Sequence, residues 1–267
     1  MPTAQPLALR AGALRAEARP AAGGLERGLP PIGPQPVDVV AHLEDRFLVT
    51  YRAPAAALLP LVPAPFTVDV RSGLGFVSVC ALTASEMGPA LLPRGLRFRN
   101  AELLYRIGVR LRGEPTFLTL RSDVTAKLLS ILGRHFSHYR PRPAEVDVTL
   151  SEGRFRLDCR SRDGLADGTF EADPAASLDL SGSVFESASE ASDFLVGMSF
   201  SAGLRRSGRV QVQQIEHTPW EPRAVRPLIA RFAYLGALET RLGTSFEYDS
   251  TLHMANVDQR WKATRCP

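Results

Sequence analysis

The chain has 267 residues, of which 45% are hydrophobic and 22% are charged, and its formal net charge is +4. This composition is typical of a soluble globular protein, and the length allows one sizeable core. The small positive charge, without a basic stripe that contains aromatic residues, argues against nucleic-acid binding. No run of about eighteen apolar residues occurs, so the sequence predicts no membrane-spanning helix.

The N-terminal segment over residues 1–37 differs from the rest in composition, because it is rich in Ala, Pro, Gly and Arg. Its prolines disfavour a long helix, and no apolar stretch resembles a secretory signal. We therefore predict a disordered or loosely attached extension over residues 1–37. A single domain over residues 38–267 and a cytoplasmic location are expected.

Strands and turns are predicted for the first part of this domain. Residues 46–53 are typical of a strand, and residues 55–61, bounded by prolines, predict a short helical turn. Residues 66–71 and 75–84 predict two more strands, and the near-continuous apolar run in the second indicates an interior sheet. Residues 86–97 contain Gly and Pro and predict a loop long enough to form a lid or rim.

A strand of alternating residues follows over positions 101–111. Apolar residues occupy one face, whereas Glu102 and Arg106 lie on the other, which predicts a half-buried strand. Residues 112–115 then predict a turn, and residues 116–121 a returning strand.

The next segment predicts a helix. Ser122 or Asp123 is a suitable N-cap residue, apolar residues follow at helical spacing, and Gly133 is typical of a helix exit. Residues 134–142 then contain two His, one Tyr and three Arg before another strand begins near Ala144. So many titratable groups in a loop between a helix and a strand indicate a functional site.

The remaining chain predicts further strands and helices. A hairpin turns at Gly153, with acidic residues on one strand and arginines on its partner, which favours cross-strand pairing on a solvated face. A helix at 187–195 begins at Ser187 or Ser189, because Glu190 follows within one turn. The other predicted elements are a short strand at 168–171, a strand at 209–217, a helix at 226–242 and a closing strand at 245–261.

The cysteines and histidines predict no metal site and no cofactor. Cys80, Cys159 and Cys266 are far apart and odd in number, so neither a zinc site nor a disulfide framework is indicated. Cys80 and Cys159 lie at apolar strand positions and are predicted to be core residues. His135 and His138 lack a clear third metal ligand.

The central block resembles the YqjF-like bacterial family, a domain of unknown function (number 2071), which is similar to the acetoacetate decarboxylase superfamily. The resemblance covers about residues 46–261, and its matching residues are Glu102, Arg106, Phe117, Gly133, Arg134, Phe136, His138 and Ala144. It implies an α+β fold, with a curved, largely antiparallel sheet or partial β-barrel and helices packed on it.

The resemblance also shows that this chain lacks the lysine expected of an acetoacetate decarboxylase. Acetoacetate decarboxylases form a Schiff base through a lysine, and in that superfamily a lysine pair follows the Gly-Arg of the helix exit. The corresponding segment here, residues 133–142, contains no lysine. Arginine cannot replace it, because its guanidinium stays protonated. Lys127 is the only internal lysine, and we expect its ammonium group to lie in water.

Five residues are candidates for the site, and most have two interpretations. Arg134 binds a substrate carboxylate, or it pairs with Glu102 beneath the loop. Glu102 is a candidate catalytic residue and Arg106 a candidate ligand-binding residue. They lie on one strand face and line the same cavity as His138, or they form an ion pair with each other. His138 is the candidate general acid–base, because histidine exchanges protons near neutral pH; the alternative is a loop histidine bonded to backbone. Tyr139 is a further candidate for ligand binding.

The sequence thus predicts a protein that binds a small organic molecule, an anion or a carbonyl compound, in the cavity of its sheet. One hypothesis is an enzyme that works without a Schiff base, with His138 as acid–base and Arg134 or Arg106 orienting the substrate. The other is a non-catalytic ligand-binding or structural protein, since the fold does not decide the function. Nucleic acid and membrane are not expected as partners, and either hypothesis is compatible with a homo-oligomer.

Overall fold

The computed structural model describes residues 35–263, except 179, 198, 206 and 207 and the side chain of Arg134. The strands are β1 (Val39–Pro54), β2 (Phe66–Val68), β3 (Leu74–Pro89), β4 (Phe98–Leu111), β5 (Glu114–Val124), β6 (Arg142–Ser151), β7 (Arg154–Ser161), β8 (Gly168–Ser177), β9 (Phe200–Leu204), β10 (Val210–His217), β11 (Arg223–Phe232) and β12 (Glu247–Trp261). The helices are α1 (Ala55–Leu58), α2 (Lys127–Phe136), α3 (Ala188–Leu195) and α4 (Ala233–Leu242), with short 3-10 helices η1 (Leu59–Leu61) and η2 (Arg94–Leu96).

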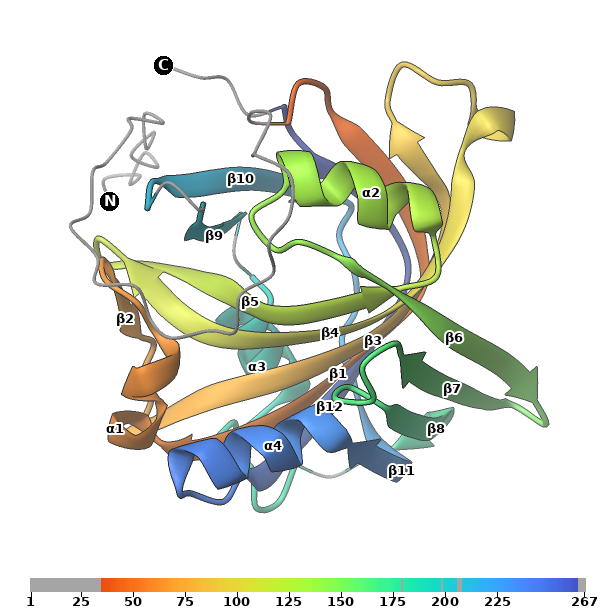
Figure 1. Ribbon diagram of the computed structural model, residues 1–267. Helices are drawn as coiled ribbons and strands as arrows, with labels where there is room; N and C mark the ends of the chain where they lie inside the picture. The colour runs from red at the N-terminus through yellow and green to blue at the C-terminus, as the bar shows by residue number, and fades with distance from the viewer. Residues whose placement is uncertain (1–34, 179, 198, 206–207, 264–267) are drawn as a thin grey trace, which may run out of the picture.

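The strands form one large curved sheet, which Figure 1 shows with α2 and α4 at opposite ends. The neighbour order is β1-β3-β4-β5-β6-β7-β8-β11-β12-β10-β9, with β2 paired to β4 and β12 also paired to β1. Among these pairings only β5–β6 is parallel. Two residue pairs at β5–β6 and two at β11–β12 join the section β6-β7-β8-β11 to the rest, and the sheet is not closed as a barrel. The predicted α+β fold class is confirmed.

Apolar residues cover both faces of the central strands β1, β3 and β4. One cluster, which includes Phe47, Tyr105 and Phe155, lies between these strands and the section β6-β7-β8. The other cluster includes Phe76 and Leu195 and lies between the strands and α3. Burial on both sides explains the near-continuous apolar run of β3, so the predicted interior strand is confirmed.

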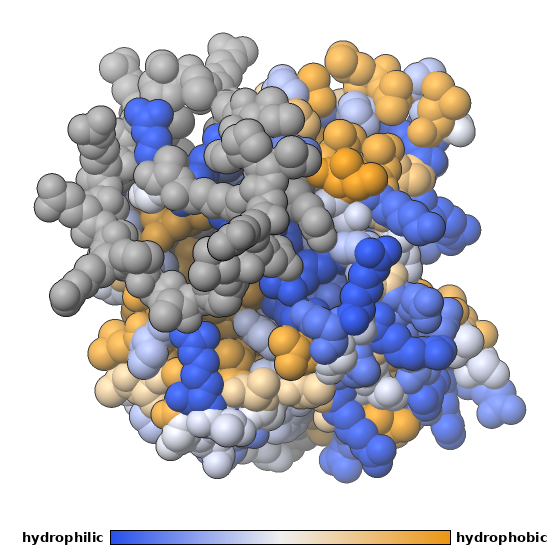
Figure 2. All heavy atoms as spheres, viewed as in Figure 1, coloured by the Kyte–Doolittle hydropathy of each residue, from blue (hydrophilic) through white to orange (hydrophobic). Residues whose placement is uncertain are grey.

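The hairpin of β6 and β7 has a solvated face, and Figure 2 shows hydrophilic residues gathered over these strands. Arg160 pairs with Asp147 across the hairpin (3.3 Å), and Arg156 binds Asp158 (2.6 Å) and Glu171 on β8 (3.0 Å). The predicted pairing across the hairpin is therefore confirmed for Arg160 and Asp147, whereas Arg156 pairs with an acid of its own strand and with one on β8. Each such exposed pair contributes about 0.2–1 kcal/mol.

The strand β4 is more deeply buried than its alternation predicts. Its polar residues Glu102 and Arg106 are only 6% and 3% exposed, so the expected half-buried strand is wrong at these positions. The reason is the second apolar cluster, which covers the face on which they lie. Polar residues on a covered face of a sheet need a specific partner or a ligand.

The predicted helix after β5 begins and ends later than expected. Ser122 and Asp123 continue β5, because they pair with β4, and this ladder takes precedence over their preference for an N-cap. The helix α2 begins at Lys127 and runs past Gly133 to Phe136. Three of its apolar residues are exposed, at 52% for Leu128, 58% for Ile131 and 43% for Leu132.

Two other predictions are corrected, and one is confirmed. Of the helix predicted over residues 226–242, residues 226–232 form a strand because they pair with β8. Only the second part, α4, is helical. Residues 86–89, expected in a loop, extend β3 along β1. The N-cap of α3 is confirmed, since Ser187 Oγ accepts from the Glu190 N–H (3.1 Å).

The predicted extension over residues 1–37 lies outside the described residues except for 35–37. There the Gln35 amide donates to the carbonyl of Trp261 at the end of β12 (3.1 Å). None of the helices described is both long and apolar enough to cross a membrane.

Candidate functional site

A cavity of about 70 Å³ lies against the covered face of β1, β3, β4 and β5. A water molecule needs about 10–15 Å³ by this measure, so the cavity has room for several waters or a small organic molecule. The polar residues with side chains that titrate or carry charge in its wall are Arg46, Cys80, Glu102, Arg106, Tyr139 and His217. The aromatic residues Phe117, Trp220 and Trp261 also line it.

The sheet register brings the first polar residues together. Arg46 on β1 lies opposite Leu82 on β3, and Leu82 lies opposite Glu102 on β4. Directly paired residues of antiparallel strands point to the same face, as do residues two and four positions apart along a strand. Arg46, Glu102 and Arg106 therefore face the same cavity from strands separated by more than fifty positions in sequence.

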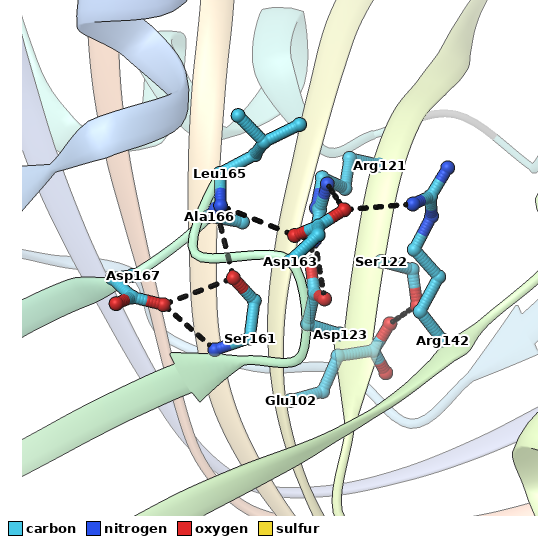
Figure 3. Close-up of polar contacts among 10 residues, drawn as sticks. All are labelled: Glu102, Arg121, Ser122, Asp123, Arg142, Ser161, Asp163, Leu165, Ala166 and Asp167. Carbon is cyan, nitrogen blue, oxygen red and sulfur yellow. Dashed lines mark hydrogen bonds and ion pairs between the residues drawn. The ribbon is translucent and has the colours of Figure 1, made fainter. Parts of the chain in front are cut away.

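Glu102 is a buried carboxyl group that titrates near neutral pH. Ser122 Oγ on β5 donates to its Oε1 (2.7 Å), as Figure 3 shows. Burial raises the pKa of Glu102 to about 7, although the Ser122 hydrogen bond and the nearby Arg46 act in the opposite direction. A carboxyl group of this kind is suited to give and take protons at physiological pH.

Arg106 is a buried cation at the wall of the cavity. Its Nη2 donates to the carbonyl of Leu195, the last residue of α3 (2.7 Å), and its guanidinium lies over the ring of Phe117 (4.7 Å). Burial lowers its pKa to about 9, and Arg46 adds to this effect. Within the part of the chain that the structure describes, no carboxylate forms an ion pair with Arg106.

Arg46 brings a second guanidinium to the cavity. Its Nε donates to Cys80 Sγ (3.3 Å), and it lowers the pKa of both Glu102 and Arg106. Two cations thus share the cavity with one carboxyl group that is only partly ionised at neutral pH. The site is complementary to an anion, which an arginine fork binds through two parallel hydrogen bonds.

Tyr139 and His138 lie side by side, with ring centroids 5.5 Å apart, but only Tyr139 lines the cavity. Burial and the charge of Glu102 raise the pKa of Tyr139, so its hydroxyl is a neutral hydrogen-bond donor. His138 packs against Gly203 of β9, where neither ring nitrogen has a hydrogen-bond partner among the described residues. Burial lowers its pKa to about 4, so the ring is neutral at pH 7. Its role as acid–base stays a prediction.

The structure places both lysines outside the cavity wall and does not describe the side chain of Arg134. Arg134 lies in α2, but its side chain is outside the described residues, so its two interpretations stay predictions. The chain has only two lysines. Lys127 is exposed at the start of α2, and Lys262 pairs with Asp38 (3.2 Å). Neither lines the cavity, so the sequence argument against a Schiff base is consistent with this geometry.

Cys80 and Cys159 are buried free thiols, as predicted for core residues, and Cys266 lies outside the described residues. Cys80 also lines the cavity, beside Arg46, which the sequence does not reveal. Across the described ranges, no three His, Cys, Asp or Glu side chains are grouped so as to hold a metal ion.

Among the wall residues that the sequence does not mark are Arg46, His217 and Trp220. Arg46 stands at the start of a predicted strand, and no local signal marks it as part of the site. His217 is isolated in sequence, but it ends β10 and contacts Trp220 (ring centroids 3.9 Å apart). Trp220 Nε1 donates to Ser192 Oγ of α3 (3.2 Å), which connects this side of the cavity to the helix.

Comparison with known proteins identifies the family. A family model, DUF2071, described as an uncharacterized conserved protein, matches residues 40–257. The chain belongs to this family. No curated protein matches it.

Solved structures share the fold at low sequence identity. Acetoacetate decarboxylase from Legionella pneumophila is 12% identical, with a TM-score of 0.59 over 91% of this chain and 93% of that one. An acetoacetate decarboxylase-like enzyme from Sphingomonas wittichii is 16% identical, with a TM-score of 0.57 over 86% of this chain and 93% of that one. The enduracididine biosynthesis enzyme MppR, complexed with pyruvate, is 12% identical, with a TM-score of 0.55 over 86% of this chain and 88% of that one. These likenesses show an acetoacetate decarboxylase-like fold.

Proposed function

We propose that this protein binds a small organic carboxylate in the cavity, held by Arg106 and Arg46. The observation that supports this most is the state of Arg106, which is 3% exposed and, among the described residues, has a carbonyl but no carboxylate as its partner. A buried charge without a counter-charge is costly, and a bound anion removes this cost.

The rest of the wall defines what the ligand carries besides its carboxylate. Phe117 and Trp220 provide apolar surface for a short hydrocarbon part. The hydroxyl of Tyr139 and the carboxyl of Glu102 provide hydrogen bonds for a second oxygen, such as a carbonyl or hydroxyl group. The volume of about 70 Å³ restricts the ligand to a small acid.

A second candidate function is an enzyme that works on this acid without a Schiff base. It is supported by Glu102, whose pKa of about 7 suits proton transfer at the cavity wall. Glu102 is better placed for this role than His138, which does not line the cavity and has a pKa of about 4. Lys127 and Lys262 lie away from the cavity, which argues against imine chemistry.

A thermal-shift panel tests the binding proposal. Propanoate, pyruvate and benzoate are compared at pH 6 with propanamide, pyruvamide and benzamide, which keep the shape and lose the charge. At least one acid is expected to raise the melting temperature in a saturable manner, because a ligand that binds only the folded state stabilises it. Equal shifts for acids and their amides, or no shift with any of the acids, would contradict the proposal.

A further inference from the structure

We propose that the cavity takes up its carboxylate ligand together with one proton, which Glu102 accepts. This inference rests on the proposed function and concerns the same site. It assigns to Glu102 the role of a proton acceptor in binding, whether or not a reaction follows.

The geometry places two carboxyl groups beside each other once a ligand is bound. Glu102 is 6% exposed and shares a cavity of about 70 Å³ with Arg106 and Arg46. A ligand carboxylate that binds these guanidiniums lies within the same small volume as the Glu102 carboxyl. Two carboxyl groups that share a buried site do not both ionise, because the like charges repel each other in a medium of low polarity.

The hydrogen bonds around Glu102 are compatible with the protonated form. Ser122 Oγ donates to Oε1 (2.7 Å), which leaves Oε2 available to carry a proton. A protonated carboxyl donates one hydrogen bond, and a ligand carboxylate is a strong acceptor for it. The same proton thus removes the repulsion and adds a contact with the ligand.

The other charged and titratable groups around Glu102 come from every neighbouring element. They are Arg46 from β1, Cys80 from β3, Arg106 from β4, Asp123 from the opposite face of β5, Tyr139 from the segment after α2 and His217 from β10. The wall residues that follow α3 (Val196) and those on β12 (Gln259 and Trp261) are uncharged. With Glu102 ionised, the net charge of the two guanidiniums and this carboxylate is +1. With Glu102 protonated, their net charge is +2, which suits an anion better.

This charge balance predicts a definite pH dependence. The pKa of Glu102 in the empty cavity is about 7, so the group is mostly ionised at pH 8 and mostly protonated at pH 6. Ligand binding then takes up about one proton at pH 8 and almost none at pH 6. The affinity for the carboxylate falls by up to about tenfold for each pH unit above 7.

Titration calorimetry tests this directly on the full chain. Propanoate, pyruvate and benzoate are titrated at pH 6 in Bis-Tris and in imidazole, and at pH 8 in triethanolamine and in Tris. The two buffers of each pair differ in ionisation enthalpy, and none of them is an anion that competes for the arginines. At pH 8 the heat is expected to differ between the buffers by close to one proton per ligand bound, and at pH 6 by much less. This wild-type result does not depend on any variant folding.

Two variants identify the group that takes the proton. Glu102→Gln keeps an oxygen acceptor for Ser122 and is expected to abolish the buffer dependence and the pH dependence of affinity. His217→Gln is the matched control at another titratable wall residue, whose pKa burial lowers, and it is expected to keep the proton uptake. Persistence of the uptake in Glu102→Gln would overturn the assignment, and its loss in His217→Gln alone would assign the proton to His217.

The remaining outcomes separate this inference from the function on which it rests. Tight binding of an acid with no proton uptake at pH 8 would refute the proton-linked inference and leave carboxylate binding intact. The absence of binding by all three acids at both pH values would refute both.

Discussion

Glu102 connects the pH of the solution to the stability of the fold. Its pKa is about 7 in the folded chain, compared with an ordinary value of 4.5. Between these two values the folded state binds more protons than the unfolded state, so raising the pH favours unfolding. The contribution of Glu102 to the free energy of unfolding is therefore fully present below pH 4.5 and is lost as the pH rises through 7.

Glu102→Gln is expected to remove this pH dependence of the free energy of unfolding, because Gln does not titrate. The free energy of unfolding of the wild type, relative to the variant, should decrease by up to about 3 kcal/mol between pH 4.5 and pH 8, since each unit of pKa shift corresponds to about 1.4 kcal/mol. Urea unfolding of both proteins at these pH values measures the difference. Parallel pH profiles would show that Glu102 is not perturbed in the folded state.

The site residues differ in how much of their role is predictable from sequence. Glu102 and Arg106 are accessible to sequence reasoning, because alternation sets them on one strand face and both match a family resemblance. Their deep burial cannot be predicted in this way, because it depends on α3, which lies some ninety positions later in the sequence and covers them. Arg46 and His217 likewise reach the cavity only through contacts between distant segments, so the sequence around each of them does not mark it as a site residue. His138 shows the converse, because its loop is rich in polar groups but its ring is buried and does not line the cavity.

At the scale of elements, an irregularity in β5 builds part of the site. Arg106 lies opposite Thr119, but the preceding residue Tyr105 lies opposite Arg121, so Leu120 is an extra residue in the ladder. The extra residue shifts the alternation of β5 by one position. Thr119 and Ser122 consequently both lie on the cavity side, and Ser122 reaches Glu102. Sequence alternation alone assigns them to opposite faces, because a bulge leaves no local pattern.

A buried ion-pair network holds the other face of β5. Arg121 pairs with Asp123 (2.6 Å) and with Asp163 in the loop between β7 and β8 (2.7 Å), and Arg142 also reaches Asp163 (3.1 Å), as Figure 3 shows. The side chains of Arg121 and Asp123 are only 4% and 1% exposed. The network attaches this loop and the start of β6 to the central strands where the β5–β6 pairing is short.

Arg121→Met is expected to lower the free energy of unfolding by about 3–5 kcal/mol, because it leaves the buried Asp123 carboxylate without its partner. Arg160→Met is the matched control, since Arg160 and its partner Asp147 are both 69% exposed and such a pair contributes about 0–1 kcal/mol. Urea or thermal unfolding of the two variants compares them. Equal, small effects would show that the network contributes little to stability.

For the molecule as a whole, the order of the strands explains both the core and the cavity. The strands β1, β3 and β4 are buried on both faces, one by the section β6-β7-β8 and the other by α3 and its flanking segments. The cavity lies where the second covering layer meets polar residues of the sheet. The fold class follows from strand alternation and the family resemblance, whereas the cavity depends on contacts between distant segments that no local pattern specifies.

Carboxylate binding by Arg106 is the claim on which this account depends, and calorimetric titration of Arg106→Met at pH 6 tests it most directly. The acid with the largest thermal shift for the wild type is the ligand, and Arg99→Met, at an arginine 79% exposed, is the control. Arg106→Met is expected to bind the acid about 10- to 100-fold more weakly, the loss typical of hydrogen bonds to a charged group, whereas Arg99→Met is expected to keep wild-type affinity. Unchanged affinity in a folded Arg106→Met protein would contradict the claim.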